Sequence, residues 1–383
     1  MLSLPSYTFI PGWLYVPLFN GIIFLLVMTA VVHGFKGDIY RWNASRSTRF
    51  IGALLVLFLI LYIGLRPTTS FREYPDFGDT VNYKRSILAL KALNPPSWLS
   101  PVNWDGEWLY GCIESFSAFY ADEHLAFLIA AIFYVGCAAL FCKRTFGIDW
   151  FLPFLMICAA FTFFAYGVNG VRNGMAASMV ILALSYRDKI WVAALLCFLA
   201  VGVHKSIYLL IAAAMLAWKI TNPKIYIAGW VLCIMAAAAG GSSISTAIAS
   251  SGFFDDPRLA GYGIRGASND GFYTGFRADF LLYSALPIIC GWYFFLRRGY
   301  RDRTFIWLYN IYITSNAFWV LMMYASFSNR FAQLSWFIMP IVLMYPWLKV
   351  KVWKDQSRRL AGFLLLCYAY SFLSAFILPY LHA

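Results

Sequence analysis

Two cationic stretches near the middle of the chain combine residue types that bind phosphate groups. Arg172 lies within the polar sequence NGVRNG, and His204 is followed directly by Lys205. An arginine at a helix start opposes the helix dipole, but together with the free N–H groups there it makes a site for an anion. His204 is as compatible with an ordinary hydrogen-bonded histidine as with a ligand-binding one. The stretches together suggest a site for an anionic substrate.

Further candidates flank these stretches in the sequence. Three carboxylates in the polar segment 66–123 could serve as a general base, and two arginines lie near the ends of later apolar runs. Each has a simpler interpretation, since most loop carboxylates are only solvated and arginines at span ends commonly just reach the membrane surface. The full set of candidates is Asp76, Asp79 and Glu107 as bases, and Arg172, His204, Lys205, Arg277 and Arg330 as ligands of a phosphate.

Cations beside carboxylates suit one kind of reaction. Arginine offers a bidentate fork to a phosphate and lysine a point charge, while a nearby carboxylate accepts the proton of a hydroxyl. Transfer of a group from a lipid pyrophosphate to a hydroxyl needs both, because the departing pyrophosphate gathers negative charge. The sequence shows no metal-binding motif and no nucleotide-binding loop, so we expect neither a metal nor a cofactor.

The elements that position these residues are predicted to be membrane-spanning helices. Of 383 residues, 62% are hydrophobic and 12% are charged, which is typical of a polytopic membrane protein. The net charge of +13 does not indicate nucleic-acid binding, since the basic residues form only short clusters between apolar runs. We predict an all-α membrane protein with about twelve transmembrane helices, some of them short: Tyr15–Phe35, Phe50–Leu65, Leu125–Cys142, Trp150–Tyr166, Met175–Tyr186, Ile190–Val203, Ser206–Trp218, Ile225–Gly240, Phe280–Leu296, Phe305–Ala325, Phe331–Leu348 and Leu360–Leu381.

Charge alternation predicts the orientation of these helices. Every second connection is basic, and together these connections hold 19 of the 30 Lys and Arg residues but only five of the 17 acids. Short cytoplasmic loops carry such an excess. Both termini and all the candidate residues are therefore expected on the extracytoplasmic side. Arg172 and His204 are predicted to return to the same membrane face.

The run Ile190–Trp218 has two interpretations. One long helix would put His204 in its middle, whereas two short helices preserve the charge alternation. We predict two short helices. Both are too short for a position facing lipid, so we expect them to be tilted or surrounded by other helices.

Two polar segments are predicted to cover the outer face of a single membrane domain, residues 1–383. Segment 66–123, with several Trp and Pro residues, is typical of a structured cap, and segment 241–277, rich in Gly and Ser, of a mobile loop. No Asp or Glu lies inside a predicted span, whereas ion-coupled transporters commonly place carboxylates near the bilayer midplane. This absence disfavours a transporter.

At the candidate site residues and the short motifs around them, the chain resembles the EpsG/Wzy-type polysaccharide polymerases. These are multispanning bacterial enzymes that assemble O-antigen (the polysaccharide of lipopolysaccharide), capsule and exopolysaccharide. The resemblance covers most of the chain in order and spacing, although each motif is short. It lies in DTVNY beginning at Asp79, Glu107, VRNG around Arg172, HKS beginning at His204, and NRF around Arg330.

The resemblance implies a membrane-embedded glycosyltransferase of the C type that uses no nucleotide-sugar donor. Such an enzyme would join undecaprenyl-pyrophosphate-linked oligosaccharide repeat units at the outer leaflet of the bacterial inner membrane. Arg172, His204 and Arg330 would hold the pyrophosphate with help from Lys205. Either Asp79 or Glu107 would activate the acceptor hydroxyl.

The remaining candidates and partners have weaker support. Asp76 and Arg277 match no motif of the family and rest on topology alone. The partners implied are the lipid-linked oligosaccharide, the lipid bilayer and, as a further candidate, a regulator of chain length.

Three other functions remain open from the sequence. A flippase for lipid-linked oligosaccharides would use the same cations, but along a path through the membrane rather than at one end. A ligase that moves finished glycan to a lipid core is chemically close to a polymerase. A non-enzymatic scaffold gives no reason for cations to gather at one face.

Overall fold

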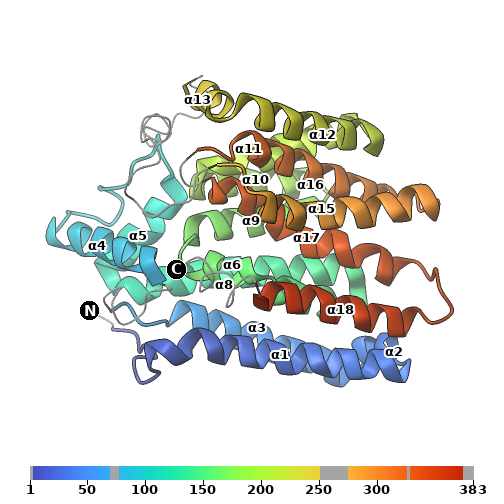
Figure 1. Ribbon diagram of the computed structural model, residues 1–383. Coiled ribbons are helices and arrows are strands. Elements are labelled where there is room, and N and C mark those ends of the chain that lie inside the picture. The colour runs from blue at the N-terminus through green and yellow to red at the C-terminus, as the bar shows by residue number, and fades with distance from the viewer. Residues whose placement is uncertain (1–2, 70–76, 251–274, 326–327, 374–383) are drawn as a thin grey trace. The chain divides into compact units, whose positions relative to one another are not determined.

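The protein is an all-α polytopic membrane protein, as predicted (Figure 1). The computed structural model describes residues 3–69, 77–250, 275–325 and 328–373, and every regular element within them is a helix. Contacts within the chain divide it into two compact units. The first unit comprises Met1–Ile207 and Val350–Ala383, and the second comprises Tyr208–Lys349.

Within the described residues, six helices are long and apolar enough to cross a membrane. They are Gly12–Lys36, Arg46–Gly64, Glu123–Asp149, Pro223–Gly240, Ala278–Arg297 and Asn329–Lys349, and a bent pair, Phe151–Ala159 with Phe161–Val168, raises the number to seven if it forms one span. Helices also occupy the other predicted runs, but they are shorter or more polar. The count of about twelve spans and the single membrane domain stay predictions.

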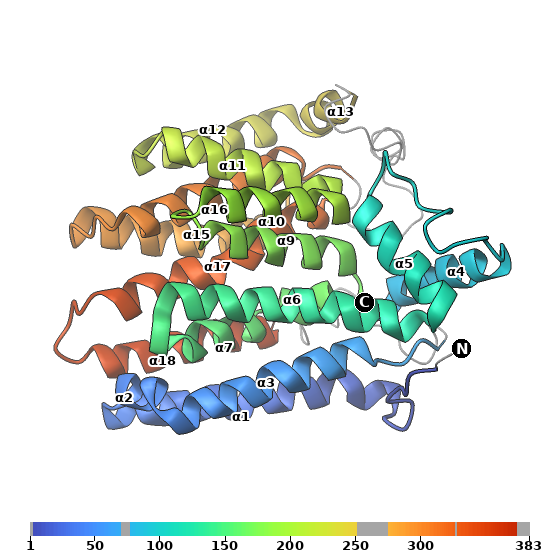
Figure 2. The same cartoon turned by 180° about the vertical axis from the view of Figure 1, so that it is seen from behind.

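In the first unit, long helices pack side by side, and a pair of shorter helices lies at one end of them (Figures 1 and 2). Helix α3 packs against α6, α6 against α9, α9 against α10, and α1 against α18. Its helices are α1 (Gly12–Lys36), α2 (Ile39–Ala44), α3 (Arg46–Gly64), α4 (Gly78–Ala92), α5 (Trp108–Tyr120), α6 (Glu123–Phe146), α7 (Phe151–Ala159), α8 (Phe161–Val168), α9 (Val171–Leu184), α10 (Ile190–Val203) and α18 (Gln356–Phe372), with short turns η2 (Gly147–Asp149) and η3 (Lys205–Ile207).

The predicted break within 190–218 is confirmed, because α10 ends at Val203 and the backbone of His204 is extended, with φ −157° and ψ 122°. A new helix, α11, starts at Tyr208. Among the described residues, α10 is not surrounded by other helices, since it buries only residues near its end and Trp191 at its start is 85% exposed; the alternative expectation of a tilted helix stays a prediction. Helix α9 before it is buried along almost its whole length, so it forms the core of the unit.

The predicted span Trp150–Tyr166 differs from expectation, since it consists of two helices, α7 and α8, that meet at 75°. The chain turns at Ala160, whose backbone is extended with φ −68° and ψ 134°. No Pro or Gly occupies the turn. The bend is therefore set by the packing of both helices within the unit, where nearly all of their side chains are buried.

The predicted cap segment, 66–123, contains the two helices at the end of the first unit, α4 and α5 (Figure 2). Arg66 is completely buried and ties this end together. It donates hydrogen bonds to Thr80 Oγ1 of α4 at 2.9 Å and to the Val168 carbonyl of α8 at 3.3 Å, and its guanidinium lies 3.9 Å from the ring centre of Phe127. These contacts fix the start of α4 against the turn that precedes α9.

In the described residues of the second unit, buried polar side chains of neighbouring helices hydrogen bond with one another. Trp230 of α12 donates to Asn316 of α16 at 2.8 Å, and Asn316 donates to Ser335 of α17 at 3.1 Å. Because a buried polar group is costly unless it is paired, these bonds favour one register of the helices. The helices are α11 (Tyr208–Lys219), α12 (Pro223–Gly240), α13 (Ser242–Ser250), α15 (Ala278–Trp292), α16 (Arg303–Leu321) and α17 (Asn329–Lys349), with a π-turn, η4 (Tyr293–Arg297), after α15.

Candidate functional site

The two cationic stretches of the sequence meet on one carboxylate. Arg172, in the first turn of α9, donates from Nη1 to Glu107 Oε2, and His204, directly after α10, hydrogen bonds through Nδ1 to Glu107 Oε1. The backbone N–H of Lys205 adds a third contact to Oε1, at 3.3 Å. Helices α9 and α10 form an antiparallel pair, so the start of one lies beside the end of the other. The prediction that Arg172 and His204 lie at the same end is confirmed.

The charge state of Glu107 follows from these contacts. Burial alone would raise the pKa of its carboxyl, but the hydrogen bond and charge of His204, the charge of Arg172 and the Lys205 N–H lower the pKa to about 2. An ionised carboxylate is only an acceptor, so Nδ1 of His204 must carry the proton of their hydrogen bond. Glu107 thereby fixes the ring of His204, which leaves Nε2 as the other polar atom of that ring.

A glycine brings the carboxylate to the cations. Gly202, two residues before His204, lies against the indole of Trp108, the residue after Glu107, and a Cβ atom at this position would meet that ring at 2.6 Å. Trp108 also packs on Phe198 of α10, with ring centres 5.6 Å apart. The absence of a side chain at Gly202 thus lets α5 approach the end of α10 closely enough for the carboxylate contacts.

Helix α4 closes the site on another side. The guanidinium of Arg172 lies 5.7 Å from the ring centre of Tyr83 and 5.8 Å from that of Tyr110. Its Nε is buried and has no hydrogen-bond partner among the described residues. Asp79, in the first turn of α4, is held nearby because its backbone N–H donates to Asn169 Oδ1 at 3.2 Å. Arg172 therefore has one donor, Nε, that no described residue satisfies.

The remaining predicted site residues differ in where they lie. Lys205 has an exposed side chain next to the Glu107 contacts. Arg277 and Arg330 belong to the second unit, where Arg277 pairs with Asp279 through bonds of 2.9 and 2.6 Å and Arg330 lies in the first turn of α17. Asp76 lies outside the described residues. The structure thus brings together Asp79, Glu107, Arg172, His204 and Lys205.

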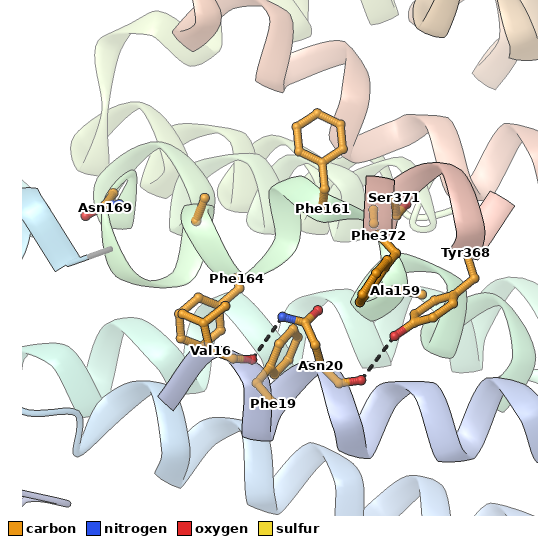
Figure 3. A pocket seen from close by; sticks show the side chains of 12 residues that line it. Val16, Phe19, Asn20, Ala159, Phe161, Phe164, Asn169, Tyr368, Ser371 and Phe372 are labelled. Carbon is orange, nitrogen blue, oxygen red and sulfur yellow. Dashed lines mark hydrogen bonds between the residues drawn. The ribbon is translucent and has the colours of Figure 1, made fainter. Parts of the chain in front are cut away.

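A pocket in the first unit adjoins this cluster (Figure 3). It has a volume of about 320 Å³ and lies between α1, the bend of α7 and α8, and α18. Its walls carry the aromatic rings of Phe19, Phe161 and Phe164, while Asn169, the residue that binds the Asp79 N–H, lies at the end away from Tyr368. The pocket therefore joins an apolar interior to the turn from which α9 and Arg172 begin.

A comparison with known families adds an independent finding. The model of a family described as the EpsG family matches residues 49–382, nearly the whole chain. The chain belongs to the EpsG family. No curated protein and no solved structure matches it. Membership in the EpsG family indicates a polysaccharide polymerase in the broad sense, with glycosyltransferase-like chemistry, and it agrees with the resemblance found in the sequence.

Several residues of this EpsG family site escaped the sequence analysis. Tyr110 and Glu114 lie one and two turns after Glu107 on α5, and Glu114 hydrogen bonds with Ser86 of α4. The spacing of three and seven residues from Glu107 could have indicated one helical face, but 108–120 was interpreted only as part of a cap. Among the described residues, no group of three or more His, Cys, Asp or Glu side chains could hold a metal ion.

Proposed function

We propose that this protein is a polysaccharide polymerase that joins undecaprenyl-pyrophosphate-linked oligosaccharide repeat units. In this reaction the growing glycan leaves its lipid pyrophosphate for a hydroxyl of the incoming unit. One observation carries the proposal: the side chains of Arg172, at the start of α9, and of His204, directly after α10, meet on the carboxylate of Glu107, directly before α5. With Lys205 adjacent, the cluster has the excess positive charge that a pyrophosphate needs.

The roles of the residues follow from their contacts. Arg172 has an unpartnered Nε, and the exposed Lys205 has three ammonium donors, so both can bind phosphate oxygens. His204 offers Nε2 to the same anion while Glu107 fixes its ring. The low pKa of Glu107, about 2, makes it a weak base at neutral pH, so its proposed role is to orient the cations. Asp79 remains a proposed base.

The electrostatics suit the leaving group. As the bond between the sugar and the pyrophosphate breaks, its electron pair moves to a phosphate oxygen and negative charge grows there. Donors fixed in advance around that oxygen stabilise the transition state more than the ground state. The half-buried position of Arg172 strengthens this effect, because screening by water is reduced.

The pocket supports a lipid-linked donor. A lipid pyrophosphate needs an apolar space for its chain within reach of the cations that hold its head. The pocket at the bend of α7 and α8 has aromatic walls, and it ends at Asn169, three residues before Arg172. We therefore assign it to the first part of the lipid chain.

The remaining features of the proposal rest on sequence. The basic connections support a proposed orientation in which both termini face the periplasm or the outside of the cell and the site lies at the outer leaflet of the bacterial inner membrane. About twelve spans and a C-type glycosyltransferase architecture belong to the same proposal. Arg277 and Arg330 are proposed as further pyrophosphate ligands, Asp76 as an alternative base, and a chain-length regulator as a partner.

Deletion of the gene and complementation with variants test this function. We expect cells without the protein to display glycan of a single repeat unit, because units are exported but not joined. Arg172→Ala is expected to lower polymerisation by about 10²–10³-fold while the protein stays in the membrane, since one donor to the leaving group is lost. Arg330→Ala is expected to act in the same direction. The glycan length distribution on gels gives the measurement.

The same experiment separates the alternatives. Units stranded on the cytoplasmic side of the deletion strain would indicate a flippase, and long glycan that remains on its lipid carrier would indicate a ligase. Long-chain glycan of normal amount in both arginine variants would contradict the proposed site.

A further inference from the structure

A second carboxylate lies on the same face of α5 as Glu107. Glu114 follows Glu107 by seven residues, almost two full turns, so the two side chains leave the helix in nearly the same direction. The rise between them is about 10 Å at 1.5 Å per residue. Tyr110 lies between them on that face, with its ring 5.8 Å from both the Arg172 guanidinium and the Tyr83 ring centre.

Glu114 faces polar groups from several elements. Ser86 of α4 hydrogen bonds with it, Arg172 of α9 attracts it, and Glu107 repels it along its own helix. The Tyr83 and Tyr110 phenols are close enough to interact with its charge. Helices α6 and α10 also pack on α5, and they contribute rings there, Phe127 beside Tyr83 and Phe198 beside Trp108, together with His204 on Glu107.

The two carboxylates of α5 differ in their partners. Glu107 forms ion pairs with Arg172 and His204, whereas Glu114 has no ion pair within 4 Å among the described residues. Burial raises the pKa of Glu114 to about 7, with the repulsion of Glu107 adding to the rise and the Arg172 charge and Ser86 hydrogen bond opposing it. A group that is half ionised near neutral pH can both take up and release a proton there.

We propose that Glu114 is the general base that accepts the proton of the acceptor sugar hydroxyl. This inference rests on the proposed function and assigns the activation of the acceptor to Glu114 in place of Asp79. The hydroxyl O–H bond breaks, its proton passes to the Glu114 carboxylate, and the freed electron pair forms the new bond to the anomeric carbon. The bond from that carbon to the pyrophosphate oxygen breaks, and its electron pair leaves with the pyrophosphate. Glu114 then releases the proton to water.

The distance along α5 fits these two roles. The leaving pyrophosphate is held at the Glu107 end, by Arg172, His204 and Lys205. The base lies two turns away on the same face, beyond the Tyr110 ring, at a rise of about 10 Å from Glu107. Glu114 is half-buried, and Ser86 of α4, which hydrogen bonds with it, is exposed, so the carboxyl lies near the surface of the protein.

The test uses the purified full-length protein and, as the probe, lipid-linked repeat units extracted from cells that lack the gene. We expect the wild-type rate of chain lengthening to rise with pH through about 7, because the ionised carboxylate is the active form. Glu114→Gln is expected to lower the rate by about 10²–10⁴-fold and to abolish that rise. Asp105→Asn, an exposed acid before the same helix, is the matched control and is expected to keep both the rate and the profile.

Two measurements separate catalysis from folding. The raised pKa means that the folded state binds more protons than the unfolded state between pH about 4.5 and 7, so ionisation of Glu114 costs stability as pH rises through that window. Glu114→Gln is therefore expected to melt no lower than the wild type at pH 8. Ser86→Ala, which removes the hydrogen bond that lowers the pKa, is expected to shift the midpoint of the pH profile upward.

The outcomes are distinguishable. An active Glu114→Gln with a wild-type pH profile overturns the inference, and so does a weakened Glu114→Gln whose midpoint stays near 7. In either case loss of activity in Arg172→Ala would leave the proposed function standing. Failure of the wild-type protein to lengthen the extracted units would overturn the proposed function and this inference together.

Discussion

Arg172 at the start of α9 and Arg277 before the start of α15 have similar surroundings. They differ in how far along the chain the carboxylate lies that each one binds. Each lies at the beginning of an apolar helix, each lies near an aromatic ring, and each pairs with a carboxylate. The carboxylate of Arg277 is Asp279, two residues away, whereas that of Arg172 is Glu107, 65 residues away in the chain and shared with His204.

This difference shows which pair depends on the fold. The pair at α15 forms wherever the helix start forms, and a partly exposed pair of this kind contributes only about 0.2–1 kcal/mol. The cluster on Glu107 forms only when α5, α9 and α10 are all in place. A local pair therefore says little about function, while a cluster assembled from distant segments indicates a site.

The largest expected difference between the two regions comes from replacing the carboxylate that each arginine binds. Glu107→Gln removes the negative charge shared by Arg172 and His204, so both cations lose their fixed positions. We expect polymerisation to fall by about 100-fold or more, as is typical when a hydrogen-bonded charge pair loses one partner. Asp279→Asn makes the same chemical change in the local pair and is expected to change activity less than threefold. Glycan length in complemented cells measures both.

Equal losses in the two variants would show that the comparison has no functional meaning. Membrane levels of each variant must match the wild type for the result to count.

A smaller effect is expected from a substitution that moves α5 away from the end of α10 and changes no charged residue. Gly202→Val places a side chain against the Trp108 ring and pushes α5 away from the end of α10. Overpacking of this kind costs about 1–3 kcal/mol, so we expect roughly a tenfold loss of activity. Gly136→Val in α6, where a Cβ atom meets nothing within 4 Å, is the matched control. The rate of chain lengthening with extracted units is the measurement.

Adding Trp108→Leu to Gly202→Val should restore much of the lost activity, because the smaller side chain makes room for valine. No recovery would argue that Gly202 acts in another way.

The smallest expected effect concerns the lipid chain rather than the charged head. Ala160→Trp fills part of the pocket at the bend of α7 and α8. We expect the donor concentration for half-maximal rate to rise roughly fivefold to tenfold at an unchanged maximal rate, since only binding is weakened. Leu25→Trp, at an exposed position of α1, serves as the control. A fall in the maximal rate alone would contradict the assignment of the pocket.

The pattern of charges in the sequence predicted that Arg172 and His204 lie at the same end, although it did not predict their contact with Glu107. Basic connections on alternate loops required a break near His204, and that break places it beside the start of α9, where Arg172 lies. The rule works because each Lys or Arg in a loop reports on orientation independently of the helices. The helical class followed from apolar runs too long for other elements.

Other features depend on packing that no local pattern reveals. The bend at Ala160 has no Pro or Gly to mark it. Glu114 lies in a partly apolar stretch, and its importance arises from Ser86 and Arg172, which are distant in sequence. Likewise, Glu107 was predicted as a base, and only its ion pairs show that it is held as an anion of low basicity.

The shared carboxylate also has a consequence for turnover. Cations without a carboxylate partner would bind the lipid diphosphate product so tightly that product release would limit each catalytic cycle. Because Glu107 already binds Arg172 and His204, an anionic ligand must compete with the Glu107 carboxylate, which is part of the protein. In the proposed reaction this competition keeps binding reversible, so the spent lipid carrier can leave and the next loaded one can bind.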